Sequence, residues 1–343
     1  MSKRFWCLVV AILAGSLLAA PLTTSAQEQF YKDKTVRIIV GFSAGGGFDT
    51  YARAIARHMR KHIPGNPAII VENMTGAGSL IAANHVYKVA KPDGLTIGHF
   101  IGSLLLGQVL GQEGIEFDAR KFEHIGAPVK DYVACALSKE SGVTSVAQCA
   151  SSKTPPKLGG TGRGGTIDNA LRVFKVALGL PVQIISPYKG TADIRIAVEA
   201  GELAGSCWEW YGMRTAWSKA LEAGKVVVVL QAAPKPFSDL PKVPLAIDLV
   251  KTQEGRQLIE AGVHDPGSIA RPYVLPPGTP KAQLLLLRKA FLDTMKDPEF
   301  LAEAKKARLQ INPLEGEEME RIVGGLFRLS PALASRLKEV LLK

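Results

Sequence analysis

A hydrophobic stretch, a run of glycines and an amphipathic segment follow one another directly in residues 35–63. Residues 36–42 are predicted to form a buried strand, because apolar side chains recur through them. Gly45, Gly46 and Gly47 then allow the backbone to turn without the steric penalty of a Cβ atom. Asp49 is expected to be the N-cap of a helix over residues 50–63. Such a unit leaves backbone N–H groups free at the positive end of a helix dipole, and it therefore predicts an anion-binding site.

Strand-like and helical patterns alternate through the rest of the chain. This alternation predicts an α/β fold of mostly parallel sheets covered by helices. Three amphipathic C-terminal segments are expected to be helices that pack as a cover. The expected strands are residues 36–42, 68–72, 95–100, 132–137, 182–185, 226–231 and 272–275. The expected helices are residues 50–63, 79–89, 168–178, 192–200, 281–295, 299–306, 316–327 and 331–342.

Two more glycine-rich turns are present, at residues 76–79, between a predicted strand and a predicted helix, and at residues 159–166, before a predicted helix. In parallel α/β sheets, ligands bind at the carboxyl ends of the strands. One such turn alone is more often only a tight turn. Three such turns together favour the interpretation that several helix starts surround an anion with backbone N–H donors.

Residues 160–165 also match the G-x-G-x-x-G fingerprint of dinucleotide sites. Those sites need an acidic residue at the end of the next strand, where this chain has Gln183, Ile184, Ile185 and Ser186. Dinucleotide binding is therefore not expected, and the chain is predicted to need no cofactor.

The sequence Gly41-Phe42-Ser43-Ala44-Gly45 matches the G-x-S-x-G nucleophile elbow. A serine hydrolase could use Ser43 with His264 and Asp265 as distant partners. However, this turn follows the first strand of the mature chain, and three glycines delay the helix beyond its place in an elbow. An exported serine hydrolase is therefore kept only as the alternative function.

His58 and His62 are four residues apart on one predicted helix, as in half of a metal site. Met59 stands where the H-E-x-x-H pattern needs glutamate, and no third ligand follows at a familiar spacing. Two solvated histidines on a polar face are the preferred interpretation, and no metal site is expected.

Trp208 and Trp210 are expected to share one face of a strand. Two interpretations stay open for them. They belong to a core cluster, or they form an aromatic wall that stacks on a planar ligand.

The first 26 residues have the features of an export signal. Lys3 and Arg4 form a basic start, an apolar stretch follows, and Thr24-Ser25-Ala26 form a cleavage site of small residues. Their removal lowers the net charge from +11 to +9 and leaves a chain long enough for two cores. The remaining charge shows no Lys/Arg stripe or reader motif, so nucleic-acid binding is not expected.

Three cysteines follow this segment, Cys135, Cys149 and Cys207. An oxidising compartment permits a Cys135–Cys149 disulfide that leaves Cys207 free. Three buried, unbridged thiols are an equally good interpretation.

Five stretches together resemble the substrate-binding proteins of tripartite tricarboxylate transporters, the Bug family of periplasmic receptors. The resemblance spans nearly the whole chain after the export signal. Gly41, Thr75, Arg163 and the Trp208–Trp210 pair depart from the usual family pattern. The matching stretches are residues 40–53, 71–79, 91–96, 187–191 and 276–280.

The resemblance implies a ligand carboxylate that is held by backbone N–H groups at the glycine turns. Neutral donors of this kind bind an anion without burying a fixed opposing charge. Asp49 would fix its turn, and Arg163 or Lys189 would add a charge contact if its side chain points inward. The implied ligand-binding residues are Ser43, Gly46, Gly47, Asp49, Ala77, Gly78, Ser79, Thr161, Arg163, Gly164, Thr166, Lys189 and Gly190, with Trp208 as the aromatic candidate.

The resemblance also implies a two-lobed periplasmic-binding-protein fold, type II-like, with mixed or parallel sheets and two crossover strands. Residues 27–126 and 231–343 would form the first domain, and residues 127–230 the second. The expected protein is a monomeric, non-enzymatic receptor in the periplasm that closes over a small carboxylate. It would deliver this ligand to the membrane subunits of a tripartite tricarboxylate system, or serve a sensor.

Overall fold

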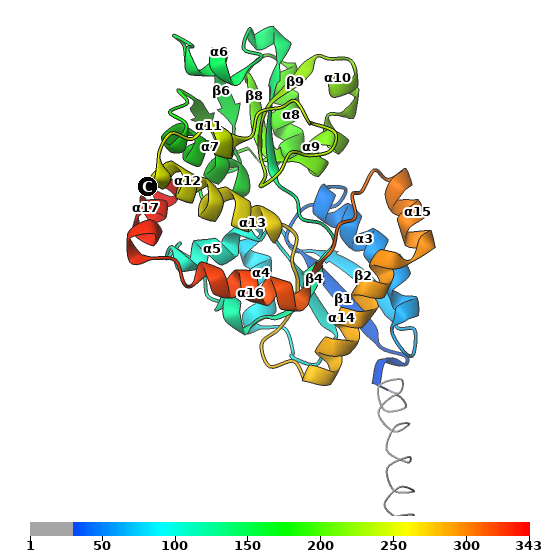
Figure 1. Ribbon diagram of the computed structural model, residues 1–343. Helices are drawn as coiled ribbons and strands as arrows, with labels where there is room; N and C mark the ends of the chain where they lie inside the picture. Colours follow the sequence, from blue (N-terminus) through cyan, green and yellow to red (C-terminus); the bar gives the residue numbers. More distant parts are fainter. Residues whose placement is uncertain (1–29, 189) are drawn as a thin grey trace, which may run out of the picture.

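The computed structural model describes residues 30–188 and 190–343. Two β-sheets, each flanked by helices, form two lobes that lie one above the other in Figure 1. The predicted export signal, residues 1–26, and Lys189 lie outside the described residues. In the described part of the chain, no helix is long and apolar enough to cross a membrane.

The first sheet has six strands in the order β11-β4-β10-β3-β1-β2. Strand β1 pairs in parallel with β2 and β3, whereas β10 runs antiparallel to β3 and β4, and β11 runs antiparallel to β4. The sheet is therefore mixed. Its strands are β1 (Thr35–Val40), β2 (Ala68–Asn73), β3 (Thr96–His99), β4 (Glu123–Ala127), β10 (Tyr273–Leu275) and β11 (Leu314–Glu315).

Helices cover both faces of this first sheet. Helices α3 (Gly47–Met59) and α14 (Lys281–Lys296) pack on one face, and α4 (Leu80–Lys88) and α16 (Gly316–Leu326) pack on the other. Successive strand residues therefore point into two different cores, which explains why Ile38, Ile39 and Val40 at the end of β1 are all buried. The remaining helical elements of this lobe are η1 (Arg60–His62), η2 (Ala77–Ser79), α5 (Ser103–Val109), η3 (Ala119–Lys121) and α15 (Pro298–Lys306).

The second sheet has five strands in the order β7-β6-β8-β5-β9. Strand β6 is parallel to β7 and β8, and β5 is antiparallel to β8 and β9. Its strands are β5 (Val133–Ser138), β6 (Lys157–Gly159), β7 (Gln183–Ile185), β8 (Gly205–Glu209) and β9 (Val226–Ala232). The helical elements between them are η4 (Lys139–Ser141), α6 (Val146–Ala150), α7 (Thr166–Ala177), α8 (Thr191–Glu199), α9 (Trp210–Ala216) and α10 (Ser218–Glu222).

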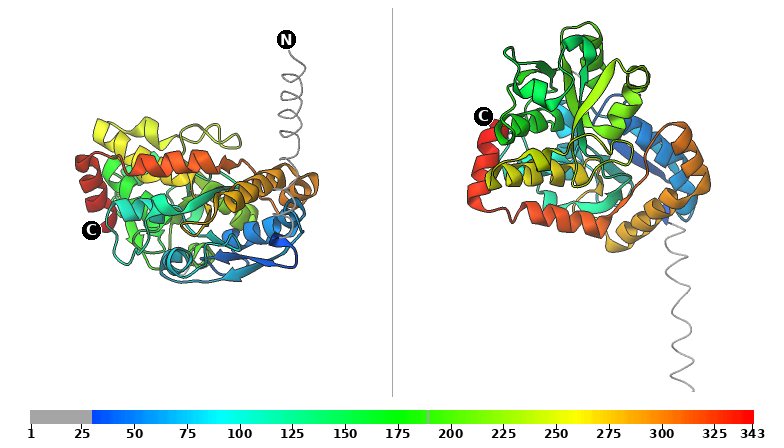
Figure 2. Two further views of the ribbon diagram at one scale, coloured as in Figure 1. Left: turned by 90° about the horizontal axis from the view of Figure 1, so that it is seen from below. Right: turned by 45° about the horizontal axis from the view of Figure 1, so that its top comes forward.

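The chain crosses between the lobes after β4 and again between β9 and β10. The first crossing is the short segment 128–132, and the second, residues 233–272, contains four helical elements. A further crossing at residues 327–330 carries α17 (Pro331–Leu342) to the second lobe, where it packs against α7 (Figures 1 and 2). The helical elements of the second crossing are α11 (Ala246–Leu249), α12 (Gln253–Ile259), the π-helical turn η5 (Glu260–His264) and α13 (Asp265–Ser268).

Every predicted strand and helix is present, with ends that differ by a few residues. Four strands were absent from the predicted ranges, namely β4, β6, β8 and β11, although a strand that carries Trp208 was expected. They have two to five residues each, and their glycines and charged residues hide the apolar pattern of a strand. The proposed division at residues 127 and 231 stays a prediction.

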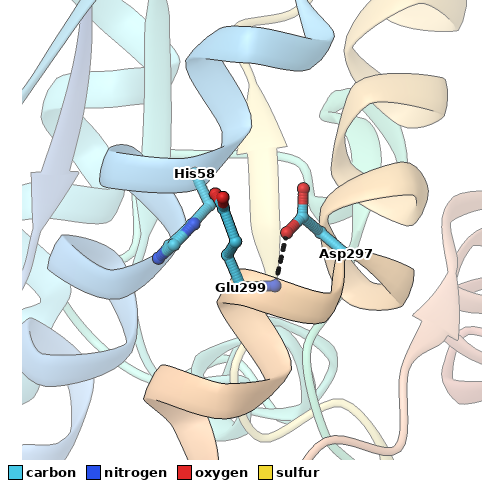
Figure 3. Close-up of side chains that lie close together, drawn as sticks. All are labelled: His58, Asp297 and Glu299. Atoms are coloured by element: carbon cyan, nitrogen blue, oxygen red, sulfur yellow. Dashed lines mark hydrogen bonds between the residues drawn. The ribbon is translucent and has the colours of Figure 1, made fainter.

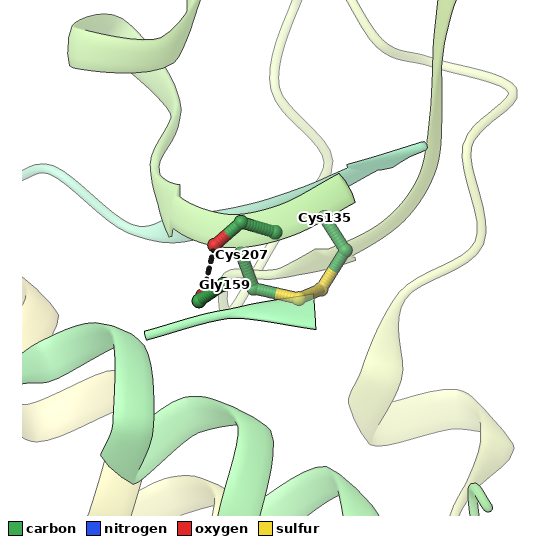
Figure 4. The surroundings of a disulfide bond; sticks show 4 residues. Cys135, Gly159 and Cys207 are labelled. Carbon is green, nitrogen blue, oxygen red and sulfur yellow. Dashed lines mark hydrogen bonds between the residues drawn. A yellow bond between two sulfur atoms is a disulfide. The ribbon is translucent and has the colours of Figure 1, made fainter. Parts of the chain in front are cut away.

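The disulfide joins Cys135 to Cys207, so the predicted Cys135–Cys149 bridge is wrong, and so is the alternative of three unbridged thiols. Cys135 and Cys207 lie directly opposite each other on antiparallel strands β5 and β8, with Cα atoms 4.0 Å apart (Figure 4). Cys149 is a buried free thiol on α6. Strand register, which spacing along the chain does not reveal, therefore decides the pairing.

Candidate functional site

The first predicted turn leads from β1 into α3, whose N-cap is Gly46 in an extended conformation. No side chain caps this helix. The first-turn amides of a helix have no partner within it, so those of Gly47 and Phe48 are available to an outside acceptor. Ser43, Gly46 and Gly47 are all exposed. These amides are the donors that the predicted anion site requires, and the site itself stays a prediction.

Asp49 is not the N-cap that the sequence suggested. It is the third residue of α3, and the residue is 2% exposed. Its carboxylate accepts hydrogen bonds from Gly45 N (2.8 Å), Arg53 Nε (2.9 Å) and Asn73 Nδ2 (2.9 Å). Burial by itself raises the pKa of Asp49, but these bonds hold the pKa below its usual range. The predicted role in fixing the turn is therefore present, by a different geometry.

The second predicted turn packs against the first. A Cβ atom on Gly41 would lie 2.2 Å from Ser79 Cβ, so only glycine fits there. The hydroxyl of Ser79 is buried and accepts a hydrogen bond from Ile101 N (3.0 Å), which gives it a structural role. Ala77 and Gly78 are exposed beside the first turn.

The third turn precedes α7 in the second lobe and has the same kind of helix start as the first turn. Gly165 is an extended N-cap without a side-chain cap, and Thr166 begins the helix. Asp168, at the third helical position, accepts from Thr161 N (2.7 Å) and Gly162 N (2.8 Å). The amide of Thr161 is therefore already paired with Asp168. The resemblance had implied that this amide is free to bind the ligand.

The other predicted residues of the second lobe make contacts of their own. The carbonyl of Gly164 accepts a bond from Ser103 Oγ (3.2 Å), so this loop meets α5 of the first lobe. Arg163 is exposed, and its Nη1 donates to the Leu342 carbonyl at 3.4 Å. Gly190 is the N-cap of α8, and neighbouring Lys189 lies outside the described residues.

The two tryptophans do not share a strand face, because β8 ends at Glu209 and Trp210 begins α9. Trp208 is 2% exposed, and its ring centre lies 4.6 Å from that of Trp217. Its indole edge also lies 3.8 Å from the point where a Cβ on Gly212 would be. Trp208 is thus a core residue at the base of α9.

Sequence reasoning missed a buried charge cluster between the lobes. Arg271, in the second crossing, donates to Asp131 of the first crossing (Nη2–Oδ2, 3.3 Å), and both side chains are at most 5% exposed. Burial raises the pKa of Asp131 to about 7, against the opposing effect of Arg271, and nearby Glu209 raises it further. No sequence motif marks these residues, because they are far apart in the chain.

A cavity of about 630 Å³ lies between the lobes. One wall comes from α9 and α10, and the other comes from α15 and the segment after it. The glycine turns do not line this cavity. Its lining residues are Trp210, Arg214, Ser218, Leu221, Glu222, Leu301, Ala304, Lys305, Arg308, Leu309, Gln310 and Ile311.

The hydrolase alternative gains no support from the structure. Ser43 is exposed and shows no hydrogen bond to a base among the described residues. His264 is 7% exposed and packs instead against Tyr132, with ring centres 6.3 Å apart.

His58 on α3 and His62 on η1 are partly exposed, and each contacts a carboxylate, so they are not the freely solvated pair that the sequence suggested. His58 Nε2 lies 2.8 Å from Glu303 Oε2, and His62 Nε2 lies 2.9 Å from Asp297 Oδ2. His58, Asp297 and Glu299 bring possible metal-ligand atoms within 4.8 Å of one another (Figure 3). However, the ammonium of Lys61 already pairs with Asp297 (2.7 Å) and Glu299 (2.6 Å).

Comparison with known structures supports the fold. BugD, a periplasmic binding protein, has a TM-score of 0.70 at 24% identity, over 90% of this chain and 98% of that one. MatC from Rhodopseudomonas palustris, solved with bound malate, has a TM-score of 0.68 at 22% identity, over 90% and 99%. An R. palustris protein solved with adipate has a TM-score of 0.70 at 19% identity, over 90% and 97%. The chain therefore has the two-lobed fold of periplasmic binding proteins, as predicted.

Comparison with proteins of related sequence identifies the family. A UPF0065 protein from the TAR-I region of Agrobacterium vitis is 28% identical over 258 residues, 71% of this chain and 68% of its own length. A UPF0065 protein from Cupriavidus necator is 22% identical over 96% of this chain and 95% of its own. The family model for the tripartite tricarboxylate transporter family receptor matches residues 51–324. Because that match covers most of the chain, this protein belongs to the tripartite tricarboxylate transporter receptor family.

Proposed function

We propose that this protein is a periplasmic receptor that captures a small organic carboxylate between its lobes and delivers it to a tripartite tricarboxylate-type membrane transporter. Residues 1–26 would be the cleaved export signal. The receptor would act as a monomer without catalysis, and its lobes would close over the ligand and signal occupancy to the membrane subunits.

One observation carries this proposal: both lobes present an uncapped helix start behind a glycine turn. Gly46 of α3 and Gly165 of α7 are extended N-caps with no side-chain cap. In each turn an aspartate at the third helical position fixes the loop, by bonds to Gly45 N or to Thr161 N and Gly162 N. Amides that are already held rigidly at the positive end of a helix bind a carboxylate with little loss of conformational entropy.

The ligands seen in two structural relatives narrow the choice of compounds to test. Malate and adipate are both dicarboxylates. The first screen is therefore a thermal-shift series with malate, adipate, tricarboxylates and acidic amino acids. A ligand at about 100 times its dissociation constant adds roughly 2.7 kcal/mol to the free energy of unfolding.

Calorimetry on Gly46→Val tests the site directly. A valine fits the extended backbone of Gly46, and its Cβ would lie no closer than 3.4 Å to any atom, the nearest being Ser43 O. The side chain should block the amides of α3 and weaken carboxylate binding at least 10-fold without loss of folding. Gly324→Val in α16 is the matched control, because its Cβ would meet only Arg328 Nη1 at 3.5 Å. Equal affinity in the two variants would contradict the proposed site.

A further inference from the structure

We propose that Arg271 is a ligand-binding residue, the fixed positive charge that meets the ligand carboxylate at the start of α3. This inference rests on the proposed function and adds a specific contact to it. A side-chain cation differs from the neutral amides of the glycine turns, because it also selects for ligand charge.

Arg271 lies at the junction of the two lobes. It precedes β10 in the second crossing, and its guanidinium carbon lies 4.5 Å from the ring centre of Phe48 and 5.1 Å from that of Tyr51, both on α3. On the other side, Arg271 Nη2 lies 3.6 Å from the point where a Cβ on Gly212 of α9 would be. The guanidinium is therefore held between the first turn of α3 and the second lobe.

The same guanidinium faces the uncapped end of α3. Nη1 and Nη2 both lie 3.5 Å from the position of a Cβ on Gly47, the first residue of that helix. A carboxylate beside Gly47 can accept hydrogen bonds from the first-turn amides and from Arg271 together. Charge-assisted bonds of this kind are shorter and stronger than bonds between neutral groups.

Arg271 is buried and keeps donors without a partner. It is 4% exposed, and within the described residues its Nε and Nη1 atoms make no hydrogen bond. Its one hydrogen bond runs from Nη2 to Asp131 at 3.3 Å. Buried donors without acceptors are rare in native proteins and call for an explanation. A ligand carboxylate would supply the missing acceptors.

The charge balance around Arg271 is compatible with a bound anion. Asp131 and Glu209 are the acidic groups whose charge acts on Arg271, and the hydroxyl of Tyr51 acts on it as well. Because burial raises the pKa of Asp131 to about 7, a proton on Asp131 can compensate for an incoming carboxylate.

The test compares two variants by calorimetry with the member of the malate and adipate pair that binds the wild-type protein more tightly. Asp131→Asn alone keeps the charge of Arg271 and should bind the dicarboxylate at least as tightly as wild type. Adding Arg271→Gln removes that charge without leaving a buried, unpaired carboxylate. Affinity in the double variant should fall roughly 10- to 150-fold below the single variant, the range for a hydrogen bond to a charged group.

The outcomes separate this inference from the proposed function. If the wild type binds and the double variant binds within twofold of Asp131→Asn, the role of Arg271 is overturned and the receptor function stands. If the wild type binds no carboxylate, the proposed function fails, and this inference fails with it. Should the double variant not fold, Arg271→Lys keeps the charge but loses the planar fork, and it should weaken binding at least fivefold. Unchanged affinity in that variant would also overturn the role of Arg271.

Discussion

At the residue scale, the partner of a side chain is often decided by strand register rather than by proximity in sequence. Cys149 is 14 positions from Cys135, yet the disulfide reaches Cys207 at a sequence separation of 72. Strands β5 and β8 place Cys135 and Cys207 opposite each other, and Cys149 stays a buried thiol on a short helix. Asp49 is a second example. One of its hydrogen-bond partners is Asn73, which is distant in sequence and lies at the end of another strand.

The disulfide should stabilise the second lobe. Cys207→Ala opens a loop closed across 72 residues, so the free energy of unfolding should fall by about 2–4 kcal/mol. Cys149→Ala is the matched control, because it removes a buried sulfur without breaking a bridge. Urea unfolding of both variants checks the difference. A loss no larger in Cys207→Ala than in Cys149→Ala would show that the bridge contributes little.

At the scale of elements, α3 and α7 begin in the same way in different lobes. Each follows a parallel strand and a glycine turn, has an extended glycine as N-cap, and carries a buried aspartate at its third position. The aspartates bind loop amides that precede the helix, so each loop is fixed to the helix that follows it. A helix start with a rigid loop is what an anion site needs.

Asp168→Ala should therefore loosen the loop before α7. It leaves the amides of Thr161 and Gly162 without their acceptor, so we expect a loss of about 1–3 kcal/mol in the free energy of unfolding, with weaker carboxylate binding. Asp193→Ala is the control. Asp193 is the third residue of α8, but its side chain makes no hydrogen bond to any of the residues that the structure describes. Chemical denaturation and calorimetry on both variants measure the effect, and equal losses would refute the role given to Asp168.

At the scale of the whole molecule, buried histidines are distributed over the first sheet and the second crossing. Burial lowers the pKa of His99 to about 3, and those of His124 and His264 to about 4. These side chains are neutral in the folded protein, whereas the unfolded chain binds protons at its ordinary pKa of about 6.5. Asp131 opposes this trend, because its raised pKa makes the folded state bind a proton between about pH 4 and pH 7.

Stability should therefore fall as the pH is lowered from about 6.5 to 4.5. Each buried histidine contributes a slope of about 1.4 kcal/mol per pH unit, and Asp131 offsets one of the three. Urea unfolding at pH 7.0, 5.5 and 4.5 measures the sum. Asp131→Asn should make the dependence steeper, and His264→Gln should make it shallower. A flat profile in the wild type would contradict the neutral state of these histidines.

The sequence alone determined the α/β class, the positions of most strands and helices and the glycine turns, because these depend on local periodicity and on the backbone freedom of glycine. It also indicated the family, through the resemblance of five stretches. It could not give the short strands such as β6 and β11, the partner of Cys135 or the true N-caps. Only the tertiary structure brought Arg271, Asp131 and Gly47 together from two interlobe crossings and the first helix. Contacts of that kind depend on how distant elements pack, and no local pattern of residues records them.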